Sequence, residues 1–438
     1  MKHIKNQSTC ISLFVILVFC ALGCSIFVTS EDWQKDLREL ETQLKERHIN
    51  IFHNVSKETF ETSVNDLHKK IPSLTTPEIL VGIAQIVAMV GDGHTSFYAS
   101  DQPDKRFNIY PISLYSFTDG IYLTAAAEEY SHLFGKRLVR IDKTPIDDAI
   151  KAINTTISAD NDMEYVYTTP FMLIRSEMLY VLGITDSINE ATYIFEDGTE
   201  QKFTSMSVSD YNSQDWLVVN SIFGPERKSP SMRHEFLFAS SLTLPHLKER
   251  KYYWYTYMKE QRTLFFQYNV CWNQKDRPSF KEVVDKMFKY LDNNPVERII
   301  IDLRQNTGGE PLIAEPLIDG LEQRSELGKN GKVFVLTGRR TFSAALTNAV
   351  HLRSKAGARI VGESPRGKPN SPSEGRDIDL ERTDIWATVS TQFVQRDSSL
   401  GDIDFLPIDI EATYTFDEYR KGLDPVMDAA LTADLYVK

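Results

Sequence analysis

The chain has 438 residues, of which 42% are hydrophobic and 25% charged, and its formal net charge is −12 at pH 7. This length predicts about two or three domains, and the composition is that of a soluble globular protein. The acidic balance and the lack of a basic stripe in the sequence argue against nucleic acid as the main partner.

The four cysteines give no disulfide framework for the body of the protein. Cys10, Cys20 and Cys24 lie in the N-terminal apolar segment, and Cys271 stands by itself in the rest of the sequence. No CxxC spacing occurs, so we expect no metal and no cofactor. Cys271 lies in an apolar, strand-like run, which predicts a buried and unreactive thiol.

The N-terminal segment has the pattern of a secretory signal. A positively charged start precedes the apolar run Ile11–Leu22. Ala21–Cys24 resembles a bacterial lipobox, in which Cys24 would be the lipidated residue, although alanine stands where leucine is usual. The alternative is an uncleaved anchor, because the apolar stretch continues through Ile26–Val28. We expect residues 1–29 to be a signal peptide, a lipoprotein signal or an anchor. The body would then lie outside the cytoplasm, either released or associated with the membrane.

Residues 30–100 are predicted to be helical. Apolar residues recur at three-to-four spacing along Trp33–Ile71, and Thr75–Val90 begins with a capping pattern. The second helix runs into Gly91–Ser96, a turn in which two glycines flank an aspartate and present His94. A lone histidine on a loop is usually incidental, but the flanking glycines favour a functional role here.

Residues 101–250 are predicted to be rich in β-strands. The run Gly135–Ile146, followed by a helix over Asp147–Ile153, resembles part of a PDZ-type module. Such a module would bind a peptide by strand addition, and the alternative is a purely structural β-subdomain. Tyr211–Lys251 is polar and contains three prolines, which indicates a loop or a transition between domains.

In residues 251–438, strands alternate with helices, which predicts an α/β fold with a parallel-rich sheet flanked by helices. The expected strands are Leu264–Val270, Arg298–Leu303, Val333–Leu336 and Arg359–Val361, and the expected helices include Phe280–Leu291, Pro311–Leu321 and Phe342–Lys355.

Three segments that follow these strands carry candidate chemistry. Asp302–Gly309 ends in two glycines, whose freedom lets N–H groups point into a site and stabilise an oxyanion. Ser343 opens a helix whose first N–H groups face its side chain, although serine is also a common N-cap. Lys368 lies in a loop between glycine and proline, and a lysine acts as a base only where its pKa is lowered. Together these segments provide the parts needed for acyl transfer.

At this point the sequence resembles the C-terminal processing, or tail-specific, serine peptidases, which include tricorn-type enzymes. The matching motifs are DLRxNxGG at 302–309, TFSAA at 341–345, GExxxGK at 362–368, GLDPV at 422–426 and GDGHT at 91–95. The resemblance covers about residues 264–435 well and the N-terminal half loosely.

The resemblance implies a serine endopeptidase on a crotonase-like (ClpP/crotonase) core, with Ser343 as the nucleophile. The N–H of Ala344 and that of Gly308 or Gly309 would form the oxyanion hole. Two residues of the sequence are candidates for the general base. Lys368 falls where the serine–lysine branch of the family places its lysine. His94 falls where the tricorn-like branch places a histidine, and there Glu374 would orient the imidazole. We favour His94, because a PDZ module typical of the serine–lysine branch is degraded or missing.

We therefore predict an extracytoplasmic serine peptidase that cleaves peptides or unfolded proteins. The alternative is an inactive homologue that acts as a binding module at the cell surface. Gln305 and Thr307 vary the glycine loop, and Pro365 and Pro369 bracket the lysine loop, as they would in a vestigial site. A crotonase-type enzyme acting on acyl thioesters is disfavoured by the N-terminal signal and by the lack of a phosphate-binding glycine motif. The sequence defines neither the cleavage specificity nor the oligomeric state.

Overall fold

The computed structural model describes residues 28–99, 107–213, 216–218, 226–228 and 251–435. The N-terminal signal or anchor, including Cys24, therefore lies outside the described residues. Among the helices of the described residues, none combines the length and the apolar character needed to cross a bilayer.

The N-terminal region is a three-helix layer, as predicted, made of α1 (Ser30–Arg47), α2 (Lys57–Lys70) and α3 (Thr76–Ala88). Thr29 with Asp32, and Thr75 with Glu78, form capping boxes that fix where α1 and α3 begin. The apolar faces of the three helices share one buried core.

The middle of the chain forms two four-stranded sheets. One has the order β2 (Ile112–Phe117), β3 (Gly120–Ala127), β8 (Trp216–Val218) and β9 (Glu226–Lys228). The other has the order β5 (Thr144–Pro145), β4 (Leu138–Ile141), β6 (Glu190–Phe195) and β7 (Glu200–Thr204). Around them lie η3 (Glu128–Leu133), α4 (Ile146–Asn154), α5 (Asp162–Met172), α6 (Ser176–Val181) and α7 (Val208–Ser213). The predicted strand, turn and helix occur at β4, β5 and α4, whereas a PDZ-type fold stays a prediction.

The C-terminal half is built on a six-stranded sheet, which confirms the predicted α/β class. Its order is β10 (Tyr253–Met258), β11 (Thr263–Tyr268), β12 (Arg298–Asp302), β13 (Val333–Thr337), β14 (Arg359–Gly362) and β17 (Ile410–Glu411). β10 is antiparallel to its neighbour, and the other neighbours are parallel. A crotonase-type core stays a prediction.

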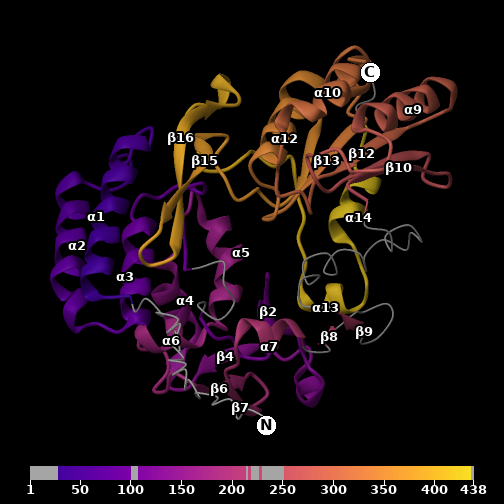
Figure 1. The fold of residues 1–438 in the computed structure, drawn as a ribbon. Coiled ribbons are helices and arrows are strands. Elements are labelled where there is room, and N and C mark those ends of the chain that lie inside the picture. The colour runs from indigo at the N-terminus through magenta and orange to yellow at the C-terminus, as the bar shows by residue number, and fades with distance from the viewer. Residues whose placement is uncertain (1–27, 100–106, 214–215, 219–225, 229–250, 436–438) are drawn as a thin grey trace, which may run out of the picture.

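Helices cover both faces of this sheet (Figure 1). One face packs against α9 (Phe280–Asn293), η6 (Pro311–Ala314), α10 (Glu315–Glu322), α11 (Glu326–Lys329) and α12 (Ala344–Ala356). The other packs against α13 (Phe416–Arg420) and α14 (Pro425–Thr432). Along β12, Ile299 and Ile301 belong to the first core and Ile300 to the second, as the alternation of a strand requires.

A long hairpin carries part of the C-terminal half over to the N-terminal helices. β15 (Asn370–Leu380) and β16 (Ile385–Gln395) pair with each other, and β16 also pairs with β1 (Ser96–Tyr98); η7 (Ser398–Leu400) follows. In Figure 1 the gold hairpin stands beside the indigo helices, and its apolar residues belong to their core. The backbone N–H and hydroxyl of Thr383 both donate to the buried Asp36 carboxylate of α1. The hairpin therefore packs with the N-terminal helices, and through β1 it lies next to the 91–96 loop.

A buried charge network ties the end of β12 to the start of α14. The Arg304 guanidinium, 2% exposed, donates to the carboxylates of Asp302 and Asp424 and to the Tyr414 hydroxyl. Asp424 also accepts the Met427 N–H as the N-cap of α14. This contact joins the DLR and GLDPV motifs and anchors the loop that begins at residue 303.

We expect Arg304→Ala to lower the free energy of unfolding by about 3–5 kcal/mol, because it leaves two buried carboxylates without their cation. Urea denaturation followed by circular dichroism measures the change. Arg420→Ala is the matched control, since Arg420 pairs with Asp417 at the surface and its loss should change stability little. Equal effects of the two variants would show that the buried network does not hold this region together.

Candidate active site

Ser343 lies on a sharp turn between β13 and α12. Its backbone has φ 52° and ψ −121°, a conformation that costs a non-glycine residue roughly 1–3 kcal/mol. The turn is held by its neighbours, because the Phe342 N–H donates to the Asn306 carbonyl at 3.1 Å and the Thr341 hydroxyl donates to the Leu303 carbonyl at 2.9 Å. The strain is thus maintained by the loop that follows β12, and it places the serine side chain at the start of α12.

The glycine pair packs directly against this turn. Gly308 has φ 111°, and a Cβ built on it would lie 2.8 Å from Ser343 Cβ and 3.1 Å from the Ala344 nitrogen. Only glycine fits there without displacing the serine. The Gly308 N–H donates to Asn306 Oδ1 at 2.9 Å, so this N–H is already engaged. Gly309 has φ 129° and follows directly in the same loop.

Cys271 holds the glycine loop through backbone hydrogen bonds. Its N–H donates to the Gly308 carbonyl at 3.1 Å, and its carbonyl accepts the Glu310 N–H at 2.8 Å. The thiol is fully buried, and burial raises its pKa to about 11. The thiol is therefore protonated at neutral pH, in agreement with the predicted unreactive cysteine.

His94 lies against Ser343, although 249 positions separate the two residues in the chain. Its Nε2 is 3.1 Å from Ser343 Oγ, and its ring stacks on Phe342 with a centroid distance of 4.5 Å. Burial, with the Arg396 and Arg366 charges, lowers the pKa of His94 to about 4 against the opposing Asp92 charge. The imidazole is then neutral at pH 7, and with its proton on Nδ1 it can accept the serine proton at Nε2.

The Asp92 carboxylate fixes the loop that carries His94. Its Oδ1 accepts the backbone N–H groups of His94 at 2.9 Å and Thr95 at 2.8 Å, as well as the Ser390 hydroxyl. Its Oδ2 lies 2.8 Å from His48 Nε2, and both side chains are fully buried. Because His48 Nδ1 accepts the Asn50 N–H, Nε2 is the donor to Asp92. Burial raises the pKa of Asp92, but the bonds from His48 and Ser390 outweigh it and hold that pKa below its usual value.

The structure does not place the other predicted side chains in this cluster. Lys368 Nζ forms an ion pair with Asp404 Oδ1 at 2.6 Å. Glu374 is exposed on β15 with φ 58°, and its carbonyl accepts the Thr391 hydroxyl. The next residue, Gly375, does approach His94: a Cβ on it would lie 3.2 Å from the His94 carbonyl oxygen. His94 Nδ1 is buried and has no hydrogen-bond partner among the described residues.

Other charged side chains surround the pair and were not singled out from the sequence. Arg366 lies 4.4 Å from the centre of the Phe342 ring and donates to both oxygens of Glu164. Arg396 donates to the carbonyls of Lys368 and Pro369 and to nearby hydroxyls, and burial lowers its pKa to about 10. Asp160 is also buried nearby. Asp92 belongs to the GDGHT motif, and its position in an Asx-turn was the sequence signal that could have identified it. The others come from distant segments with no local pattern.

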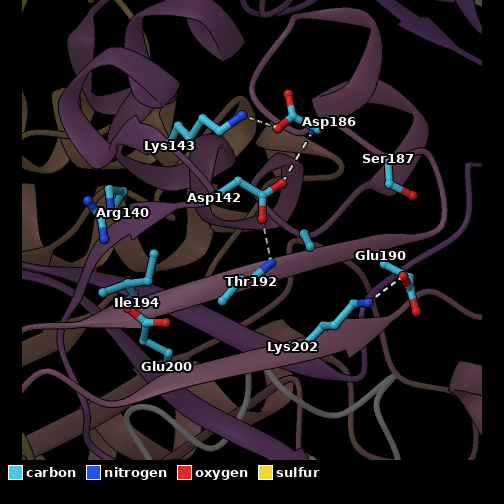
Figure 2. Close-up of a pocket in the computed structure, with 11 residues that line it drawn as sticks. Arg140, Asp142, Lys143, Asp186, Ser187, Glu190, Thr192, Ile194, Glu200 and Lys202 are labelled. Carbon is cyan, nitrogen blue, oxygen red and sulfur yellow. Dashed lines mark hydrogen bonds and ion pairs between the residues drawn. The ribbon is translucent and has the colours of Figure 1, made fainter.

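A concavity of about 390 Å³ lies on the sheet β5–β4–β6–β7, away from Ser343 (Figure 2). Its charges are largely satisfied by each other, since Lys143 pairs with Asp186 and Lys202 with Glu190. The Asp142 carboxylate accepts backbone N–H groups of Thr192 and Asp186. None of the residues that line it belongs to the Ser343 cluster, so this pocket adds nothing to the candidate chemistry.

Comparison with solved structures gives a likeness to serine peptidases. Mature CPAF complexed with lactacystin is 13% identical with a TM-score of 0.56, and the match covers 92% of this chain and 97% of that one. The photosystem II D1 C-terminal processing protease is 12% identical with a TM-score of 0.38, over 87% of this chain and 93% of that one. The tricorn protease is 13% identical with a TM-score of 0.40, over 92% of this chain and 36% of that one.

No family model matches the sequence, and no curated protein matches it. At this low identity the CPAF likeness establishes a shared fold. The predicted resemblance to the C-terminal processing peptidases is thus confirmed at the level of the fold. A shared fold does not determine the reaction, which depends on the residues of the site.

We expect Asp92→Asn to lower the free energy of unfolding by about 1–3 kcal/mol, because an amide cannot accept from all four donors and leaves one of them buried and unpaired. Thermal and urea unfolding measure this loss. Asp404→Asn is the control, since Asp404 is largely exposed and should contribute little. If the two variants are equally stable, Asp92 does not fix the loop in the way described.

Proposed function

We propose that the chain is a serine peptidase of the C-terminal processing (tail-specific) family, which hydrolyses peptide bonds through an acyl-enzyme on Ser343. The observation that supports it most directly is the 3.1 Å contact between Ser343 Oγ and His94 Nε2, made by a serine on a strained turn at a helix start. A nucleophile in contact with a neutral base is the minimum that acyl transfer requires.

In the proposed reaction, Ser343 Oγ attacks the carbonyl carbon of the scissile bond while His94 Nε2 takes its proton. The carbonyl oxygen becomes an oxyanion, and the N–H groups of Ala344 and Gly309 stabilise it. We favour Gly309 over Gly308 because the Gly308 N–H is bonded to Asn306. The intermediate collapses with cleavage of the C–N bond, and the leaving amine takes the proton from His94. Water, deprotonated by His94, then hydrolyses the ester and restores Ser343.

The base in this proposal is His94 rather than Lys368. The Lys368 ammonium is paired with Asp404, whereas the imidazole of His94 touches the serine hydroxyl. Glu374 is the residue that the family resemblance assigns to orient the imidazole. Its exposed position on β15 means that this role needs a movement of the hairpin segment next to Gly375.

The expected location is extracytoplasmic, and the N-terminal segment 1–29 carries that expectation through its charged start, apolar run and Cys24. Membrane association would come from the same segment. The proposed substrates are peptides or unfolded proteins, because a backbone must reach a serine that lies between the glycine loop and the 91–96 loop. We propose no cofactor and no metal.

A binding module without turnover is the second candidate. It is favoured by one observation: His94 Nδ1 contacts no carboxylate among the described residues, so the imidazolium formed in the reaction lacks a hydrogen-bonded partner. A serine-reactive phosphonate distinguishes the two functions, since an activated serine is labelled and an inert one is not.

We expect Ser343→Ala to lower kcat/KM for an unstructured peptide by at least about 10³-fold and to abolish phosphonate labelling. Alanine keeps the Cβ and meets the same backbone requirement as serine at this position, so the protein should stay folded. Ser73→Ala, at an exposed serine, is the control and should retain full activity and labelling. Turnover that survives in Ser343→Ala rules out the acyl-enzyme mechanism.

Separate replacement of the two candidate bases tests the assignment of the proton acceptor. His94→Ala should lower kcat by about 10²–10⁴-fold, because the serine hydroxyl loses the group that takes its proton. Lys368→Ala removes a partly exposed ion pair and should change kcat by less than about tenfold. Peptide hydrolysis with circular dichroism as a folding check measures both. The reverse order of effects would assign the base to Lys368.

A further inference from the structure

Two buried polar groups near Ser343 lack a hydrogen-bond partner of good geometry among the described residues. One is Nδ1 of His94, and the other is the Asp160 carboxyl, whose oxygens have no hydrogen bond of good geometry although the Gly93 N–H lies close enough to act on them. Asp160 is only 7% exposed. Buried polar groups nearly always have hydrogen-bond partners, so two such groups without a good partner in one region need a physical explanation.

Both groups lie in the same buried compartment. A Cβ built on Gly93, the residue before His94, would lie 3.0 Å from Asp160 Oδ2 and 3.0 Å from the Phe342 ring. That ring is the one that stacks on the His94 imidazole. On the far side, a Cβ on Gly367 would lie 3.6 Å from the same carboxyl oxygen and from the same ring. The Asp160 carboxyl thus lies next to Gly93, the residue before His94, in the same region as the ring that stacks on His94.

The two groups are chemically complementary. The His94 tautomer that receives a proton at Nε2 carries hydrogen on Nδ1, which is a donor. An ionised carboxylate offers only acceptors. The compartment therefore contains a donor without an acceptor, next to a carboxylate that can accept more hydrogen bonds than the Gly93 N–H supplies.

We propose that Asp160 is a positioning residue for the reaction: its ionised carboxylate holds the Nδ1–H of His94 and stabilises the imidazolium that forms when Nε2 takes the Ser343 proton. This inference rests on the proposed peptidase function. It gives the orienting role to a buried residue from the segment between α4 and α5 rather than to the exposed Glu374.

The protonation state of Asp160 then sets the pH dependence. The charged groups around it and His94 are Asp92 from the 91–96 loop, Glu164 from α5, Arg396 after β16 and Arg366 from the loop after β14. Burial, with the charges of Asp92 and Glu164, raises the pKa of Asp160 to about 7, against the opposing pull of the Gly93 N–H and Arg396. Below pH 7 the carboxyl is protonated and uncharged, so activity should rise as pH increases through about 7. Titration of His94 itself would place the rise near pH 4.

The same shift has a consequence for stability. The folded-state pKa of Asp160 lies above the usual value of 3.8, so its stabilising contribution is complete below about pH 4 and is lost as pH rises through about 7. Asp160→Asn avoids that loss. The variant should therefore melt at a higher temperature than the unaltered protein at pH 8, and the difference should shrink at low pH.

The test compares pH profiles of Asp160→Asn with those of Asp162→Asn, an exposed aspartate two positions away. At pH 8.5 we expect Asp160→Asn to lower kcat by about 10–100-fold with little change in KM, because the amide carries no charge. At pH 5.5 its activity should match that of the unaltered protein, so that the rise near pH 7 disappears. Asp162→Asn should keep the rise. A rise that persists in Asp160→Asn, or one that is lost only in Glu374→Gln, overturns the proposal.

A second measurement does not depend on turnover. In Ser343→Ala protein with isotope-labelled histidine, the His94 ring signals should show a step near pH 7 that reports ionisation of the neighbouring carboxyl. His94→Gln assigns the signal, and Asp160→Asn should remove the step. The absence of any step near pH 7 overturns the inference. If Ser343→Ala retains turnover instead, the peptidase mechanism fails while this titration still reports on Asp160.

Discussion

The buried carboxylate of Asp92 is the contact on which the candidate site depends. It joins His48 at the end of α1, the 91–96 loop and Ser390 of β16. These three segments come from opposite ends of the chain, and β16 belongs to the hairpin that follows β14 of the six-stranded sheet. Without this carboxylate, the backbone N–H groups of His94 and Thr95 would have no acceptor in a buried position. The position of the imidazole is therefore an outcome of long-range packing, even though the histidine lies on a short local turn.

The turn at Ser343 also depends on contacts with segments that are distant in the chain. The turn at Ser343 is strained, and the strain persists because residues 303–309 bind it through Leu303 and Asn306 and press Gly308 against it. That loop is in turn anchored by the buried Arg304 network, which reaches to Asp424 near the C-terminus. The motifs at 302–309, 341–345 and 422–426 are thus joined to one another by hydrogen bonds and close packing. Their joint presence is explained by geometry as well as by chemistry.

Much of this was predictable from local sequence. The capping pattern at the start of α3, the alternating strands and helices of residues 251–435, the turn at Ser343 and the glycine pair all carry short-range signals, and the structure has these elements where they were expected. The capping box of α1 was not predicted. The hairpin β15–β16 was not predicted, and its pairing with β1 could not be read from a local pattern because Tyr98 and its partner Trp386 lie 386 − 98 = 288 positions apart. The pairing of Lys368 with Asp404, which lie 36 positions apart, was missed for the same reason. Asp160 carries no sequence signal, since its significance lies in what surrounds it.

The proposed reaction has two conflicting electrostatic requirements, one for the resting imidazole and one for the imidazolium that forms from it. A base that is ready at neutral pH must be uncharged, and burial together with Arg396 and Arg366 ensures this for His94. The same positive charges oppose the imidazolium that proton transfer creates, so a negative charge has to compensate during the reaction. The Asp92 carboxylate contributes at a distance, but its oxygens are occupied by four donors that hold the loop. A compensating carboxylate must therefore be able to accept a further hydrogen bond close to His94, and we propose Asp160 for this role because neither of its oxygens has a hydrogen bond of good geometry. In the proposed mechanism the resting base is neutral, and the charge of its transition state is compensated by Asp160, whose pKa burial raises to about 7.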